Sequence, residues 1–411
     1  MRAAVVGGGL AGLAAAIDLA DAGVEVTVYE ARPTLGGAVQ TLPERDGDPD
    51  PPPDNGQHIA LGCFRAYLGF LARIGQAGSY ARRRLELPVI GPDGAAAAIR
   101  PTAAAILRYA HLPMKDRLCI PLVTARCRTA QPKPGESFGD LLRRLGTSEL
   151  ALDRFWDVFI RPALNLPADG ADAGAGLFVV RTTFLGPRAA SDLVLPTQPL
   201  GAMHGDAAGA ALERAGGVVR LGERVESLDE LDADAVVVAV PPAESARLLG
   251  EPDPGLEDSP IVSAHLLFDR PILDVAYAAL LASDAHWVFD RGALTGHRPE
   301  AGGQYLTVVS SGVPGLLEIR GRDLVDHLVG QLTERLGNAE LLWSRVSREP
   351  YATFALRPGV VRPGVGTSRP NVARAGTWTD TGWPATMESA VRSGHAAAQH
   401  LLSTARAKVS A

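Results

Sequence analysis

The pattern that most restricts how this chain folds lies in residues 1–30, MRAAVVGGGLAGLAAAIDLADAGVEVTVYE. Residues 3–6 form a short apolar run, a glycine cluster follows, and residues 13–22 continue with the composition of an apolar helix. Residues 24–29 then alternate as a second strand. A strand, a glycine turn, a helix and a second strand in this order predict a parallel sheet that binds a dinucleotide.

The three glycines of this pattern have separate physical roles. Gly7, Gly9 and Gly12 form G-x-G-x-x-G: the first allows the tight turn, the second lets a pyrophosphate approach, and the third lets the helix pack closely. Backbone N–H groups at Leu10 and Ala11, at the start of the helix, are then free to bind phosphate. Glu30 lies 18 residues after Gly12, where a carboxylate accepts ribose hydroxyls.

Composition excludes several classes of protein. With 411 residues, of which 46% are hydrophobic, the chain is long enough for a large core and more than one domain. A net charge of −6 argues against nucleic acid as a partner. The three cysteines lack metal-ligand spacing and form no disulfide framework, which favours the cytoplasm. We expect neither a signal peptide nor a membrane-spanning helix, and no metal site.

The nucleotide-binding features are divided along the chain, which predicts a discontinuous domain. The expected fold is α/β, with a Rossmann-like FAD-binding domain of the glutathione reductase type and an inserted α+β substrate domain. We assign residues 1–80, 200–255 and 355–411 to the first domain, and residues 81–199 and 256–354 to the second.

Periodicity predicts the remaining elements. We expect a helix over 59–74, a hairpin within 80–99, and a largely helical stretch over 101–166 that is interrupted at Pro113 and Pro121. Further helices are expected at 197–215, 323–337 and 384–402. Strands are expected at 218–221, 224–228, 235–240, 263–268, 287–290, 305–310 and 352–355.

Residues 30–37, EARPTLGG, extend the glycine pattern. They resemble the E-x-x-x-x-x-G-G motif of FAD enzymes in the amine oxidase and phytoene desaturase superfamily. The resemblance implies that Glu30, Ala31, Arg32, Gly36, Gly37 and Ala38 adjoin FAD. An arginine normally follows the two glycines in that superfamily. Ala38 stands there in this chain, so Arg32 or another cation must neutralise the phosphates.

The block D-N-G-Q-H-I-A-L-G at residues 54–62 is more specific. It is similar to the corresponding block of hydroxysqualene dehydroxylases, which are also known as squalene-associated FAD-dependent desaturases. The resemblance implies that Gln57 and His58 begin a helix beside the flavin ring, with Asp54 and Asn55 in a position to cap that helix.

Residues 376–394, GTWTDTGWPATMESAVRSG, resemble the C-terminal flavin motif of the same family. The resemblance implies cofactor contacts from Gly376 and Thr377 and from the start of a helix at Pro384, Ala385 and Thr386. The family has an aspartate where this chain has Thr377. Glu388 and Ser389 are expected on the surface of that helix. Val225 is the residue whose backbone would pair with adenine.

The resemblance implies reductive removal of the hydroxyl of hydroxysqualene, with hydride from reduced flavin, in the synthesis of squalene and hopanoids. A general acid is then needed. His58 is our first candidate, Asp380 the second, and Gln57 is expected beside them. The electron donor, either NADPH or a protein, has no motif of its own.

A long isoprenoid substrate favours a membrane surface as partner. Residues 101–123, apolar with interspersed basic side chains, could meet that surface, although the pattern favours a core role. The protein is expected free in the cytoplasm or on the inner face of the cell membrane. Two alternatives stay open: an oxidative desaturase or amine oxidase, and a non-catalytic scaffold that resembles a flavoprotein.

Overall fold

The computed structural model describes residues 1–299 and 302–409, and its first sheet is wholly parallel. Apolar, buried strands lie at its centre, as expected for a sheet covered on both faces. Across the sheet the order is β15 (Val372–Arg374), β9 (Ala235–Val238), β1 (Arg2–Val6), β2 (Glu25–Glu30) and β8 (Val218–Leu221). The predicted β-α-β start of the chain is therefore confirmed.

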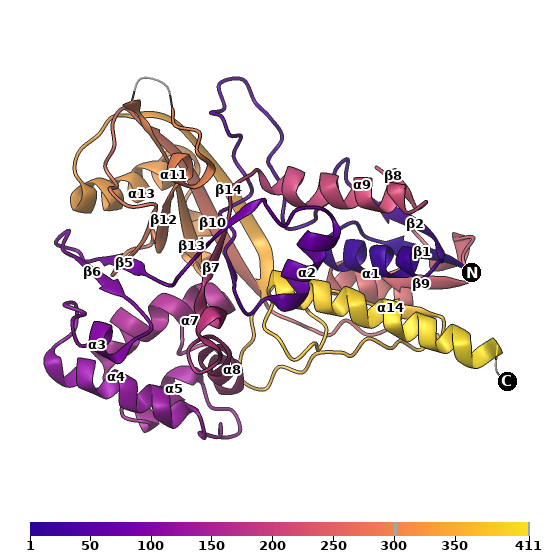
Figure 1. Ribbon diagram of the computed structural model, residues 1–411, viewed down its shortest axis with the longest axis horizontal. Coiled ribbons are helices and arrows are strands. Elements are labelled where there is room, and N and C mark those ends of the chain that lie inside the picture. Colours follow the sequence, from indigo (N-terminus) through magenta and orange to yellow (C-terminus); the bar gives the residue numbers. More distant parts are fainter. Residues whose placement is uncertain (300–301, 410–411) are drawn as a thin grey trace.

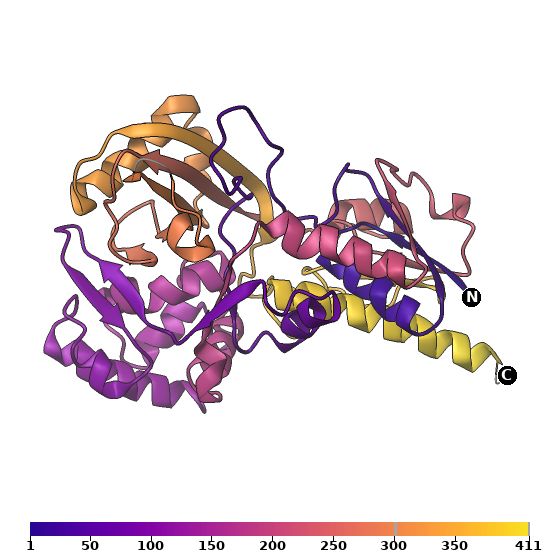
Figure 2. The ribbon, with the colours of Figure 1, turned by 45° about the horizontal axis from the view of Figure 1, so that its top comes forward.

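Helices from both ends of the chain cover one face of this sheet. α1 (Leu10–Asp21) packs along α14 (Met387–Val409), as Figures 1 and 2 show. A Cβ on Gly394 would lie 2.2 Å from the Ala11 carbonyl oxygen, so the two helices are closer than any larger side chain would allow. α2 (Arg65–Arg73) and α9 (Ala207–Arg214) join the same core, and α10 (Pro242–Leu249) lies on the opposite face.

The second sheet has seven strands and forms the upper left of Figure 1. All its pairs are antiparallel except β11–β5. Its order is β14 (Leu341–Phe354), β10 (Asp258–Phe268), β13 (Gln304–Ser311), β12 (Trp287–Asp290), β11 (Tyr277–Leu280), β5 (Leu87–Ile90) and β6 (Ala96–Ile99). α11 (Arg291–Thr295) follows β12, and α12 (Pro314–Glu318) and α13 (Gly321–Leu336) pack on one face.

A layer of helices packs below the second sheet (Figure 1). It contains α3 (Ala103–Ile106), α4 (Met114–Cys127), α5 (Phe138–Arg144), α6 (Glu149–Ala151), the π-helix η1 (Leu152–Trp156), α7 (Asp157–Leu164) and α8 (Ala173–Thr183). A small sheet, β3 (Ala60–Leu61), β7 (Leu193–Pro196) and β4 (Tyr80–Arg83), joins this layer to the first domain. The short helices η2 (Arg188–Ser191), η3 (Ala202–Asp206) and η4 (Leu228–Glu230) complete the described chain. Within it, no helix has the length and apolar character needed to cross a bilayer.

Several predicted elements are wrong in detail. The helix expected over 59–74 starts only at Arg65, because Ala60 and Leu61 pair with β7 instead. Residues 224–228 form no strand. Pro121 lies inside α4 rather than at a break. The helix expected over 197–215 begins as the π-helix η3, and α8 was not predicted.

Candidate cofactor and active site

Every parallel strand of the first sheet ends at one edge, and the predicted cofactor residues follow those ends. Gly7 follows β1, Glu30 closes β2, Val225 comes after β8, and Gly376 comes after β15. Ligands of open α/β sheets bind at this carboxyl edge. The fold therefore brings together four segments that the sequence separates.

The glycines after β1 form a cradle with one open side. Gly7 has a φ of +107°, and a Cβ there would lie 2.3 Å from the Ala239 carbonyl oxygen. A Cβ on Gly12 would lie 1.9 Å from the Gly7 carbonyl oxygen. A Cβ on Gly9, in contrast, would meet nothing nearer than the Gly37 Cα at 3.7 Å. The space beside Gly9 is the space that a pyrophosphate needs.

The N-terminus of α1 faces this space. No side chain caps the helix, so the N–H groups of its first turn, at Leu10, Ala11 and Gly12, have no capping partner. Free amides at the positive end of a helix dipole favour a phosphate. The donors thus fit the diphosphate of FAD.

Glu30 and its neighbours build the adenosine end. The Glu30 carboxylate accepts hydrogen bonds from the N–H groups of Gly8 (2.7 Å) and Arg32 (2.8 Å), so its position is fixed. The N–H groups of Gly222 and Glu223 donate to the carbonyls of Arg32 and Glu30. These bonds bring the chain that leads to Val225 beside Glu30. The Val225 carbonyl accepts from Arg247 (3.3 Å), whereas the Val225 N–H has no hydrogen-bond acceptor among the described residues.

The double glycine lies against the first glycine turn. The Gly36 N–H donates to the Gly8 carbonyl (2.9 Å), and a Cβ on Gly37 would lie only 2.9 Å from the Gly9 Cα. Ala38 is exposed, and its carbonyl accepts from the Asn55 side chain (2.8 Å). Within the described chain the Arg32 guanidinium has no partner and is exposed, whereas Ala31 offers only backbone. Arg32 is the free cation at this end of the cradle.

Asp54 organises the D-N-G-Q-H segment, but not as a helix cap. Its carboxylate accepts from the Thr41 hydroxyl (2.8 Å) and the Leu200 N–H (2.9 Å), and it pairs with Arg291 (2.9 Å). Both side chains of this ion pair are almost completely buried. Burial raises the pKa of Asp54, and the neighbouring Arg291 opposes that rise.

Gln57 and His58 therefore lie in an extended segment before β3, not at a helix start. The Gln57 amide oxygen accepts from Arg291 (3.2 Å), and its NH₂ group donates to the His58 carbonyl (3.3 Å). Arg291 also donates to the Pro52 carbonyl (3.4 Å). One buried guanidinium from the second sheet thus fixes the segment on both sides of Asp54.

His58 lies next to the buried Gln57 and is itself half-buried. Burial and the neighbouring His204 lower the pKa of His58 to about 4. His204 lies in η3, and its Nδ1 contacts the Leu200 carbonyl (2.8 Å) while its Nε2 contacts the Tyr67 hydroxyl (2.8 Å). A carbonyl only accepts, so Nδ1 carries the proton and Tyr67 donates to Nε2. Burial lowers the pKa of His204 to about 4 as well, so both imidazoles are neutral at pH 7.

The C-terminal motif forms a second loop at the sheet edge. Gly376 has a φ of +152°, and its N–H donates to the Ser393 hydroxyl (2.9 Å). Trp378 is buried and donates to the Val240 carbonyl (3.1 Å). The Thr377 carbonyl accepts from Ser389 (3.5 Å). Pro384 and Ala385 lead into α14, where the Thr386 hydroxyl accepts from the Ser389 N–H (3.3 Å) as an N-cap.

Glu388 and Ser389 are fully buried, so their expected surface position is wrong. The Glu388 carboxylate accepts from the N–H groups of Ala66 (3.2 Å) and Tyr67 (2.9 Å) and pairs with Arg392 (2.7 Å). These amides belong to the first turn of α2, which lacks a cap from its own segment. A carboxylate from α14 therefore caps α2, and it fixes Tyr67 under His204.

Asp380 faces away from this interior. Its carboxylate is more than half exposed and pairs with Arg362 (3.1 Å), which also donates to the carbonyls of Thr379 and Trp383. These contacts brace the loop. They do not place Asp380 beside His58 as a shared proton donor.

Aromatic rings line the junction between the domains. Trp383 is half-buried and packs edge to face with Phe178 of α8 (4.9 Å between centroids) and with Phe64 (5.8 Å). The Arg392 guanidinium lies over the same indole at 5.0 Å. This cluster supplies an apolar wall next to the C-terminal motif.

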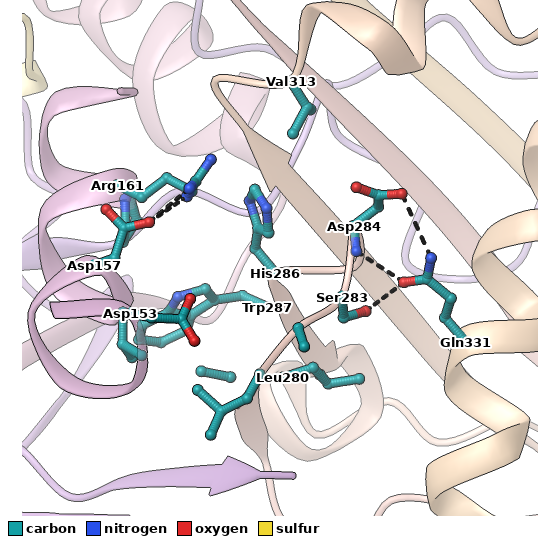
Figure 3. Close-up of a pocket in the computed structure, with 15 residues that line it drawn as sticks. Asp153, Asp157, Arg161, Leu280, Ser283, Asp284, His286, Trp287, Val313 and Gln331 are labelled. Atoms are coloured by element: carbon teal, nitrogen blue, oxygen red, sulfur yellow. Dashed lines mark hydrogen bonds and ion pairs between the residues drawn. The ribbon is translucent and has the colours of Figure 1, made fainter. Parts of the chain in front are cut away.

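A separate cavity of about 340 Å³ lies in the second domain (Figure 3). Asp157 and Arg161 of α7 pair on one side of it, His286 lies at its centre, and Gln331 bonds Ser283 and Asp284 on the other side. None of the predicted cofactor or catalytic residues lines it. Its mixed acidic and basic lining differs from the amide-rich edge of the first sheet.

Sequence reasoning missed the residues that support the site: Tyr67, His204, Arg291, Arg362 and Glu388. Arg291 is the clearest case, because an arginine after a strand carries no local signal that it will be buried. Glu388 is the exception only in that it lies inside the C-terminal motif; no local signal shows that it caps α2.

The family model for flavin-containing amine oxidoreductases matches residues 10–402. A hydroxysqualene dehydroxylase from Rhodopseudomonas palustris is 31% identical over 98% of this chain and 99% of its own. A probable zeta-carotene desaturase from Synechococcus elongatus is 25% identical, with 98% of each chain covered. Among solved structures, an oxidoreductase from Methanosarcina mazei superposes with a TM-score of 0.74 at 18% identity, covering 96% of this chain and 99% of that one.

Proposed function

Because this chain belongs to the family of flavin-containing amine oxidoreductases, it is an FAD-dependent oxidoreductase, and we propose that it removes the hydroxyl group of hydroxysqualene to give squalene. The confirmed family sets aside the non-catalytic scaffold. Membership of the family does not by itself determine the substrate, or whether the enzyme reduces or oxidises it.

The observation that carries the proposal is the D-N-G-Q-H segment within an end-to-end likeness to a hydroxysqualene dehydroxylase. Asp54 and Gln57 are both bound to the buried Arg291, and His58 follows as the accessible end of the segment. The segment is therefore built to hold one imidazole in place. This supports a chemical role for His58 more than a purely structural one.

The proposed reaction breaks a C–O bond and forms a C–H bond at an allylic carbon. The hydroxyl leaves as water after gaining a proton, and a hydride adds to the carbon. When bound, reduced FAD supplies that hydride. The fitted cradle at Gly9, Glu30, Gly37 and Gly376 would hold the cofactor, and the chain must supply the proton and exclude water.

His58 is the residue we assign to the proton. A pKa of about 4 keeps the His58 imidazole neutral at pH 7, so it first donates a hydrogen bond to the hydroxyl. A negative charge brought into the site would raise that pKa and favour the imidazolium. His204, bound to the Tyr67 hydroxyl, is close enough to affect the pKa of His58, and the packed rings of Trp383 and Phe178 give the C-terminal motif an apolar wall that would help to exclude water.

A product assay tests the proposal. Holoenzyme is reduced with dithionite under anaerobic conditions and mixed with hydroxysqualene, and the extract is analysed for squalene. The dithionite makes the unidentified natural donor unnecessary. We expect squalene from the wild type, and the same amount of bound flavin but a loss of about 10²-fold or more in turnover for His58→Ala. Absence of squalene from a flavin-loaded wild type would refute the function, and full turnover of the variant would exclude His58.

A second candidate is an oxidative desaturase, which the likeness to a probable zeta-carotene desaturase favours. Such an enzyme would start from oxidised flavin and introduce a double bond. The same preparation, oxidised and mixed with a carotene precursor, would then show flavin bleaching. The dehydroxylase proposal expects no bleaching there.

A further inference from the structure

α4 has two apolar faces, and only one of them is covered. Ile120, Val123 and Cys127 are buried in the core of the helical layer. On the other side Met114, Leu118 and Leu122 are 55%, 54% and 59% exposed. Residues four apart lie above one another on a helix, so these three side chains form a continuous stripe.

The short helix α3 extends this stripe. Leu107 is 36% exposed, and Ala103, Ala104 and Ala110 are exposed around it. We call Leu107, Met114, Leu118 and Leu122 the α3–α4 surface. Figures 1 and 2 both place α3 and α4 at the end of the molecule opposite the two termini. An exposed apolar patch of this kind marks an interaction surface.

The connection between the two helices is rigid. Arg117 donates from its guanidinium to the carbonyls of Leu112 (2.6 Å) and Leu107 (3.2 Å). Tyr109 is buried and donates to the Arg154 carbonyl (2.7 Å). The apolar side chains are therefore presented from a fixed platform.

Charge identifies what covers this surface. Residues 101–130 contain five basic side chains but one acid, Asp116, which is buried, although the whole chain carries a net charge of −6. Arg108, Lys115 and Arg128 are exposed and have no side-chain partner in the described chain. Free cations around an apolar stripe complement anionic lipid headgroups above acyl chains.

We propose that the α3–α4 surface docks on an anionic lipid bilayer, with the apolar stripe among the acyl chains and the basic side chains at the headgroups. A second copy of the chain is a poorer occupant, because a two-fold contact would place the same unpaired cations against each other. The use of this contact to take up an isoprenoid substrate rests on the proposed function. The docking itself does not.

Flotation of the FAD-loaded full chain with vesicles tests the docking. Vesicles of phosphatidylcholine with phosphatidylglycerol are compared with vesicles of phosphatidylcholine alone. We expect the wild type to float with the anionic vesicles, and the double variant L118E/L122E to show at least about a tenfold lower partition coefficient. Leu342→Glu is the matched control, since Leu342 is 58% exposed on β14 and lies in the other layer. Equal flotation of L118E/L122E and wild type, or no flotation of the wild type, would overturn the proposal.

Further variants test the role of the basic side chains and whether a bilayer or a second copy of the chain covers the α3–α4 surface. R108E/K115E should lose the preference for anionic vesicles, whereas Arg320→Glu, an exposed arginine on the far layer, should keep it. A dimer that L118E disperses, without vesicle binding, would assign the surface to a second copy instead. L118E/L122E should keep wild-type turnover of detergent-dispersed hydroxysqualene. If the wild type floats but makes no squalene, the proposed function fails while the docking stands.

Discussion

The buried ion pair between Arg291 and Asp54 allows a sharp test of how the second domain supports the site. Replacing Arg291 by Met removes the cation but keeps most of the side-chain volume. The Asp54 carboxylate then retains the Thr41 hydroxyl and the Leu200 N–H as donors, but it has no counter-charge in an interior where its exposed fraction is 1%.

The expected cost follows from that burial. Removing one partner of a buried pair leaves an uncompensated charge and costs about 3–5 kcal/mol. The exposed pair of Arg73 and Asp21, with side chains 44% and 43% accessible, provides the control. Arg73→Met there should cost about 1 kcal/mol or less. The double variant D54N/R291M removes both charges and should recover at least about 2 kcal/mol of the loss.

The dependence on pH separates this electrostatic account from a packing defect. Arg291 lowers the pKa of Asp54, so without it the folded-state pKa rises further above the unfolded value of 3.8. A raised folded-state pKa gives stability at low pH that is lost as pH increases through that pKa. The difference between Arg291→Met and wild type should therefore be smaller at about pH 5 than at about pH 8.

Urea unfolding of the wild type and the three variants at both pH values supplies the measurement. Flavin binding and turnover, measured in parallel, show whether the D-N-G-Q-H segment has moved. We expect turnover to fall more than flavin content, because Arg291 contacts Gln57 but none of the glycines of the cradle. A loss below about 1 kcal/mol for Arg291→Met, or a loss independent of pH and not recovered in D54N/R291M, would refute this reasoning.

Three further predictions concern the cradle, the cap and acid stability. Gly9→Ala should fold normally, because its Cβ would lie no closer than 3.7 Å to any residue other than its chain neighbours, but it should take up less FAD. Gly12→Ala, whose Cβ would lie 1.9 Å from a carbonyl oxygen, should yield little folded protein. Equal flavin absorbance in Gly9→Ala and wild type would contradict this. Glu388→Ala leaves the first turn of α2 uncapped and should lower the free energy of unfolding in urea by about 2–4 kcal/mol. Glu388→Gln should recover part of that loss. A loss of no more than about 0.5 kcal/mol for Glu388→Ala would show that the cap contributes little. Burial lowers the pKa of His204 from 6.5 to about 4, so on acidification the unfolded chain binds a proton at this residue before the folded chain does. The free energy of unfolding should therefore fall by about 2 kcal/mol between about pH 7.5 and about pH 5 from this residue alone. His204→Gln should lose that part of the pH dependence, and an unchanged pH dependence would disprove the assignment.

The parts of the fold that the sequence predicts are those with local causes. Residues 2–30 form their strands and helix where pattern and glycine spacing place them, because each element there is specified by its own residues. The helix expected over 59–74 fails for the opposite reason. Its apolar spacing is helical, but Ala60 and Leu61 pair with Val194 and Leu193, and a partner so distant in sequence leaves no trace in a local pattern.

The same distinction explains the candidate site. Motif spacing identifies the groups at the edge of the first sheet, since each must satisfy a backbone requirement that only glycine or a short polar side chain meets. It does not identify what surrounds His58, because Arg291 reaches the segment from the start of α11, and the neighbouring His204 comes from a π-helix. The effect of these two residues depends on their burial, and burial results from contacts between segments that are far apart in the sequence.

At Ala38 the sequence departs from the family motif, and the folded structure shows how the loop is held there. In this family an arginine is expected after the double glycine, and its absence implies a weaker hold on the phosphates. In the folded chain the Ala38 carbonyl is held by Asn55 of the D-N-G-Q-H segment, so the loop keeps its place without that arginine. The exposed Arg32 guanidinium, unpaired in the described chain, leaves a positive charge next to Glu30. We therefore expect the backbone amides of α1 to provide most of the fixed phosphate donors, with the Arg32 cation at the edge of the cradle.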